Sequence, residues 1–84
     1  MTELPRYEYE KLADLIAADI ASGKLPIGAA LPGERAMTQI HGVSIGTARR
    51  ALRELRRRGL VATLPHKGTF VINAEAQADD GESQ

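Results

Sequence analysis

The chain has 84 residues, with 11 basic and 11 acidic side chains and no cysteine. This length predicts one small domain without a disulfide framework or a thiolate metal site. The sequence has no apolar run near the roughly 20 residues of a membrane span and no hydrophobic signal core, so we expect a cytoplasmic protein with no membrane partner.

The net charge of zero is an average over unlike parts of the chain. Residues 74–84 hold four acidic groups and no base, whereas residues 1–73 have 11 basic against 7 acidic side chains. Residues 49–58 alone contain six arginines and one glutamate. A polyanion responds to local charge of this kind, so this segment is a candidate binding surface.

The first half of the chain predicts two helices joined by a connector. Residues 9–21 place apolar side chains at three- and four-residue steps, which favours an amphipathic helix that ends at Gly23. The connector is rich in glycine and proline, with a short extended piece around Ala30 and Leu31. Residues 34–40 predict a second helix, which His41-Gly42 stops; Met37 and Ile40 are expected to face inward.

Residues 44–58 predict a third helix with Ser44 as its N-cap. At 100° per residue one side is apolar, and the opposite side carries Gly46, Arg49, Arg50, Arg53 and Arg57. Arg58 points nearer the apolar side, so we expect it to contact the helix C-terminus or to cover apolar surface, whereas the role of Arg56 stays open.

Two β-rich segments follow, at residues 61–64 and 69–73, with Pro-His-Lys-Gly between them, which predicts a hairpin. The expected fold is α+β: a winged helix-turn-helix of three helices followed by a two-stranded wing, at residues 6–73. Residues 74–84 are acidic and non-periodic, and we expect a disordered tail there.

This arrangement meets the physical requirements of DNA reading. A recognition helix enters the major groove with its N-terminal residues first. Small residues there allow close backbone approach, and the planar fork of arginine matches the O6/N7 edge of guanine.

The sequence resembles the DNA-binding domain of the GntR family of bacterial transcription regulators. The resemblance runs over residues 9–71 and rests on IASGKLPIGAALPGER, HGVSIGTARRALRELRRRGLV and KGTFV. It implies sequence-specific binding of duplex DNA through a recognition helix at residues 44–58 and a wing at residues 64–69, and transcription regulation by repression. The matching positions imply DNA contacts from Arg35, Ser44, Thr47, Arg49, Lys67 and Gly68. Of these, Arg49 corresponds to an arginine that reads a guanine. From the charge and size of their side chains we add Gly46, Arg50, Arg53 and His66.

The chain also departs from the family pattern. Gly33 replaces a usual serine or alanine, which weakens the cap of the second helix, and Ile45 stands where arginine is frequent. Arg50 replaces a usual glutamate. Pro65 and His66 alter the wing tip, where a glycine often precedes the basic residue. These changes leave the DNA-binding interpretation intact but make the family's typical operator a poor guide to this one.

The resemblance also bears on assembly. Family members continue into a C-terminal domain that binds a metabolite and dimerises, so we expect no effector domain in this chain, a free monomer, and two copies on an inverted repeat. An alternative is a winged-helix interaction module whose arginine face docks an acidic protein. We expect no catalytic site, no cofactor and no metal, because no base adjoins Ser44 or Thr47 and two histidines without further ligands do not make a metal site.

Overall fold

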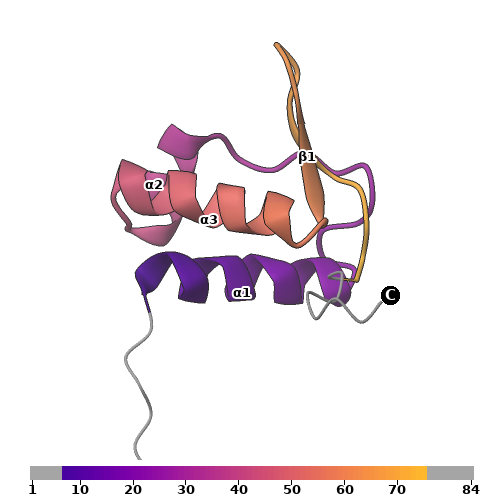
Figure 1. Cartoon of the computed structure of the whole chain (residues 1–84), viewed down its shortest axis with the longest axis horizontal. Helices are drawn as coiled ribbons and strands as arrows, with labels where there is room; N and C mark the ends of the chain where they lie inside the picture. The colour runs from indigo at the N-terminus through magenta and orange to yellow at the C-terminus, as the bar shows by residue number, and fades with distance from the viewer. Residues whose placement is uncertain (1–6, 76–84) are drawn as a thin grey trace, which may run out of the picture.

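The computed structural model describes residues 7–75. The first helix, α1 (Glu8–Ala21), lies beside α3 (Ile45–Arg57), and the two pack along most of their lengths (Figure 1). Leu12, Ile16 and Ile20 are buried on the inner face of α1 because they recur at helical spacing. Within residues 7–75 no helix is long and apolar enough to cross a membrane.

The second helix, α2 (Glu34–His41), packs on α3, and a short connection joins the two helices. Gly42 ends α2 with φ 67°, a left-handed conformation in which a side chain would be strained. Ser44 then caps α3, as predicted, by accepting a hydrogen bond from the backbone N–H of Thr47 at 3.1 Å. The chain therefore reverses from one helix to the next within three residues, which is the geometry of a helix-turn-helix.

The antiparallel hairpin of β1 (Val61–Leu64) and β2 (Gly68–Val71) follows α3 and rises away from α1 in Figure 1. Val61 lies opposite Val71, and Leu64 opposite Gly68. The predicted extended piece of the connector is present as a bridge between Ala30 and Phe70. These contacts anchor the base of the hairpin and leave its tip exposed.

A single apolar core joins the three helices to the hairpin. Ala48, Ala51, Leu52 and Leu55 form the buried face of α3, as the helical pattern predicts. The buried set is completed by residues from the other elements: Leu12, Ala13, Ile16, Ile20, Leu31, Met37, Leu60, Val61 and Val71. The opposite face of α3 is consequently free for contacts outside the domain.

The predicted order of three helices and a two-stranded hairpin is confirmed, and the element ends differ by one or two residues. The first helix begins at Glu8 rather than at Tyr9, and the second ends at His41 rather than at Ile40. The second strand is Gly68–Val71 rather than 69–73, because the backbone N–H groups of Ile72 and Asn73 both donate to the carbonyl oxygen of Leu60. Of the predicted tail, residues 76–84 lie outside the described part of the chain.

The prediction that Ile40 faces inward is wrong. Ile40 is 62% exposed, whereas Met37 is fully buried. A step of three residues rotates an α-helix by about 300°, so Ile40 lies about 60° away from the direction of Met37. In a helix of eight residues this offset is enough to leave Met37 as the one buried side chain of α2.

Candidate nucleic-acid interface

The N-terminal end of α3 presents a small polar surface to solvent. Ser44 and Gly46 are exposed, and the Ser44 hydroxyl donates to Thr47 Oγ1 at 3.1 Å. A Cβ added at Gly46 would meet only Ser44 Oγ, at 3.9 Å, which is ordinary contact. The fold therefore does not require glycine at position 46, and the small residue there leaves the backbone open to an approaching surface. Ile45, beside it, is 44% exposed and presents an apolar side chain where a cation would be accommodated.

Arg49 is tied to α2. Its Nη2 donates to Oε1 of Glu34 at 3.2 Å, and its Nε lies 3.4 and 3.3 Å from Oε1 and Oε2. Both side chains remain substantially exposed, so this ion pair has little weight in stability. It does fix the direction of the guanidinium, since the carboxylate engages two of its nitrogens.

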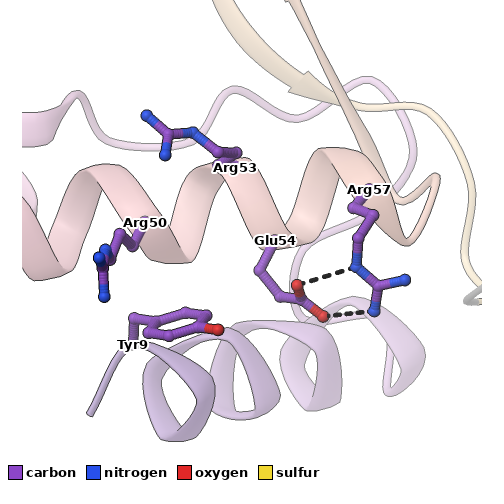
Figure 2. A pocket seen from close by; sticks show the side chains of 5 residues that line it. All are labelled: Tyr9, Arg50, Arg53, Glu54 and Arg57. Atoms are coloured by element: carbon purple, nitrogen blue, oxygen red, sulfur yellow. Dashed lines mark hydrogen bonds and ion pairs between the residues drawn. The ribbon is translucent and has the colours of Figure 1, made fainter. Parts of the chain in front are cut away.

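Arg50 lies on the other flank of α3, over the ring of Tyr9 at 5.7 Å from the ring centroid (Figure 2). Arg53, one turn further along, is exposed. Across residues 7–75, neither Arg50 nor Arg53 has a carboxylate partner. These two arginines, together with Arg56 further along α3, therefore carry charge that no carboxylate of the described residues neutralises.

The C-terminal turn of α3 uses its arginines differently. Arg57 and Arg58 both contact Glu54 at 2.8 Å, and Arg58 also reaches Asp14 of α1 at 2.9 Å. The Arg57 hydrogen bond is the largest cause that lowers the pKa of Glu54 from about 4.5 to about 2; burial opposes the shift and the Arg58 hydrogen bond adds to it. Arg58 faces the core side, as predicted, but its partners are carboxylates rather than the helix C-terminus.

Arg56, whose role the sequence left open, faces the hairpin. Its Nη1 donates to Thr63 Oγ1 on β1 at 3.0 Å, and Thr63 shares a second hydrogen bond with Thr69 on β2 at 2.8 Å. Arg56, Arg57 and Arg58 thus connect α3 to the rest of the domain, which separates them from Arg50 and Arg53.

The tip of the hairpin is a tight turn closed by the N–H of Lys67 donating to the carbonyl oxygen of Leu64 at 3.0 Å. His66 has φ 63°, the left-handed region that favours glycine. It thus holds a conformation that glycine adopts without strain. Lys67 is exposed beside it, and Gly68, with φ 122°, begins β2.

The structure brings some of the predicted residues together and separates others. Ser44, Gly46, Thr47 and Arg49 share the N-terminal end of α3, while His66, Lys67 and Gly68 form a second group at the hairpin tip. Arg35 lies exposed in the first turn of α2, where its carbonyl oxygen accepts from the Thr38 hydroxyl at 2.6 Å.

Sequence reasoning missed Glu34 and Tyr9 as partners of the arginines. Glu34 is fifteen positions from Arg49, and the crossing of α2 and α3 brings them together. No local pattern in the sequence indicates either contact.

The comparison with known proteins agrees with this geometry. Residues 8–71 match the model of "Bacterial regulatory proteins, gntR family". The chain belongs to the GntR family. This membership, with the observed three helices and two-stranded hairpin, confirms the predicted winged helix-turn-helix fold.

Individual GntR relatives are longer than this chain. It is 42% identical over 73 residues to the putative HTH-type transcriptional regulator RmpR of Mycobacterium gastri, covering 83% of this chain and 27% of that protein. It is 41% identical over 71 residues to the mannosyl-D-glycerate transport/metabolism system repressor MngR of Escherichia coli, covering 84% of this chain and 30% of the repressor. The chain therefore spans less than a third of the length of these relatives.

Solved structures give the same fold. The DNA-binding domain of AraR, in complex with operator ORR3, has a TM-score of 0.76 and 31% identity, over 84% of this chain and 86% of that one. A transcriptional regulator from Oenococcus oeni has a TM-score of 0.78 and 27% identity, over 86% of this chain and 61% of that one.

Proposed function

We propose that the chain binds duplex DNA sequence-specifically and regulates transcription, with α3 in the major groove. The observation that carries the proposal is the N-terminal end of α3, where an open backbone at Gly46 lies about one turn before the exposed Arg49 and Arg50. Small leading residues followed by long cationic donors are what entry into the groove requires. The likeness to the AraR domain, whose structure contains operator DNA, supports the same proposal.

The residues divide into base readers and backbone contacts. Arg49 reads a guanine, because its guanidinium is already directed by Glu34 and retains Nη1 for a further hydrogen bond. Ser44 and Thr47 frame the base edge and bind phosphate, and Arg35 contacts the adjoining backbone. Lys67, with His66 and Gly68, contacts backbone or the neighbouring minor groove from the hairpin tip.

Regulation takes the form of repression, by occluding a promoter on cytoplasmic DNA. The relation to MngR, which is named a repressor, supports this direction. A reporter gene placed behind the selected operator tests it: expression falls when the chain is supplied, and a rise would indicate activation instead.

Two copies bind an inverted repeat, and the free chain is a monomer. One recognition helix reads only a few base pairs, so a second copy is needed for useful specificity. The larger part of the apolar side chains of the described residues lies in one core, and the exposed ones, such as Leu15, Ile27 and Ile40, come from separate elements, whereas a stable dimer interface buries roughly 1,000 Å². Sedimentation at tens of micromolar, with and without a palindromic duplex, tests both statements; a dimer without DNA would overturn the first.

The test of DNA binding is selection from a random duplex pool followed by titration at several salt concentrations. We expect one enriched sequence and an affinity that falls linearly, on logarithmic scales, with salt. The alternative is a module whose arginine face docks an acidic protein. It predicts that no sequence is enriched and that an acidic polypeptide competes as well as duplex DNA.

A further inference from the structure

A recess of about 410 Å³ lies between the first turn of α1 and the middle of α3. Its lining side chains are those of Tyr9, Arg50, Arg53, Glu54 and Arg57. Figure 2 shows Arg50 over the ring of Tyr9 at one end and Glu54 paired with Arg57 at the other. Arg53 leaves α3 on the side away from Tyr9, so its guanidinium stands at the rim (Figure 2). Arg49, paired with Glu34 of α2, lies about 100° around α3 from Arg50 and does not line the recess.

The charge of this recess is suited to an anion. Three guanidinium groups line it against one carboxylate. That carboxylate, Glu54, already accepts hydrogen bonds from Arg57 and from Arg58 outside the recess, so it does not compete for the other cations. Among residues 7–75, Arg50 and Arg53 have no hydrogen bond or ion pair with a carboxylate, and their donors stay available to an incoming group.

The tyrosine ring gives Arg50 a support that leaves its donors unused. Arg50 lies 5.7 Å from the Tyr9 centroid, within the range of a cation–π contact. The Tyr9 ring is in turn stacked on the ring of Tyr7, with 5.9 Å between the two centroids and 17° between the planes. Because a ring is not a carboxylate acceptor, this contact supports the Arg50 side chain and leaves it hydrogen-bond donors for an incoming oxygen.

We propose that this recess binds a backbone phosphate of the DNA strand that borders the major groove on the α1 side. The proposal rests on the DNA-binding function above and extends it to Tyr9 as a positioning residue. With α3 in the groove, Arg49 and Arg50 point to different sides because consecutive residues of a helix lie 100° apart. Arg49 is directed on the α2 side toward the bases, and Arg50, over α1, meets the flanking strand. Arg53 lies between these two directions around α3, at the rim of the recess. The side chains that line the recess suit a phosphate, because they offer arginine donors and positive charge, and because the one carboxylate, Glu54, is already paired with Arg57 and Arg58.

The first experiment measures the salt dependence of binding to the selected duplex. Arg50→Gln lowers the slope of log K against log salt by about 0.9, the value of one B-DNA phosphate contact. Between about 50 and 200 mM salt, the factor by which affinity falls is therefore roughly threefold smaller for Arg50→Gln than for the native chain. Arg56→Gln is the matched control, since it removes the same charge from the same helix but on the hairpin side. Equal slopes for the two variants would overturn the proposal, because the effect would then be one of overall charge.

The second experiment locates the phosphate. A set of selected duplexes, each with one neutral methylphosphonate in place of a phosphate, is titrated with native chain and with Arg50→Gln. We expect one flanking position at which the substitution weakens the native chain and leaves Arg50→Gln unaffected. If every position weakens both proteins equally, the recess holds no phosphate. If the native chain does not distinguish selected from scrambled duplex, the DNA-binding function itself fails, which is a different result.

Two further arms address the ring and the source of the anion. Tyr9→Phe keeps the native salt slope, whereas Tyr9→Leu, checked by thermal melting, shifts it toward that of Arg50→Gln. An unchanged slope in folded Tyr9→Leu would remove the positioning role of the ring.

A titration with inorganic phosphate, followed by NMR, addresses the source of the anion. We expect millimolar phosphate to leave the amide signals of Arg50 and Arg53 unmoved. Saturable shifts would show a site for free phosphate in place of a contact to DNA.

Discussion

Glu34 in the first turn of α2 holds the guanidinium of Arg49 on α3, with Nη2 of Arg49 3.2 Å from Oε1 of Glu34. An exposed ion pair of this kind contributes only about 0–1 kcal/mol to folding. Its consequence lies in orientation: the base-reading arginine is directed before DNA arrives, which reduces the ordering cost of the contact.

Glu34→Gln is therefore expected to leave thermal stability nearly unchanged and to reduce discrimination between selected and scrambled duplex. The reduction is roughly five- to tenfold, at the lower end of the value of about 1–3 kcal/mol for a bidentate base contact. Fluorescence anisotropy with both duplexes measures it. Asp19→Asn removes one negative charge from the far end of α1 and is the control; if both variants keep the native ratio, the Glu34 contact has no part in recognition.

Gly46→Ala separates the needs of the fold from those of DNA approach. A methyl group at this position meets only ordinary contact, and alanine is favoured over glycine within a helix by up to about 1 kcal/mol. We expect a higher melting temperature together with weaker binding of the selected duplex. Unchanged affinity in the more stable variant would show that the backbone does not approach DNA at this position.

His66→Gly relieves the left-handed conformation of the hairpin tip. With φ at 63°, His66 is sterically strained in the folded chain, and glycine would not be. Glycine also raises the conformational entropy of the unfolded chain, which opposes this gain in stability. We expect stability to change by less than about 1 kcal/mol while binding to all duplexes weakens, because the imidazole contact is lost. Chemical denaturation and anisotropy measure the two effects; DNA affinity equal to that of the native chain would remove His66 from the interface.

Glu54 makes part of the stability depend on pH. Its pKa in the folded chain is about 2, below the ordinary value near 4.5, because Arg57 and then Arg58 bind the charged form. A lowered pKa stabilises the fold above about pH 4.5, and this contribution is lost as the pH falls toward 2. We expect Glu54→Gln to be about 1–2 kcal/mol less stable than the native chain at pH 7, with the difference shrinking toward pH 3. Urea denaturation across this range tests it, and a difference that does not vary with pH would contradict the assignment.

The fold could be predicted from the sequence because local signals agree with one another. The apolar period of residues 9–21, the cap at Ser44 and the stop at Gly42 each depend on neighbouring residues alone. The exposure of Ile40 could not be predicted in this way, because a short helix offers too few turns to fix the direction of its buried face.

The candidate site was predicted only in part, for a physical reason. Charge and spacing indicate which arginines face away from the core, but not which ones the domain itself neutralises. Arg57 and Arg50 look alike in the sequence, yet Arg57 is paired with Glu54 while Arg50 lies over Tyr9. That distinction depends on how α1 and α2 pack against α3, which is a tertiary property.

The central claim is that α3 reads base edges through Arg49, and the most direct measurement is the ratio of affinities for selected and scrambled duplex in Arg49→Ala and Arg49→Lys. Lysine keeps the charge but not the planar fork, so it separates attraction to the backbone from base reading. We expect both variants to lose about 1–3 kcal/mol on the selected duplex and to lose preference at one base pair, with Arg49→Lys retaining more affinity for scrambled DNA. Equal losses on the two duplexes in Arg49→Ala, or full discrimination in Arg49→Lys, would contradict the claim.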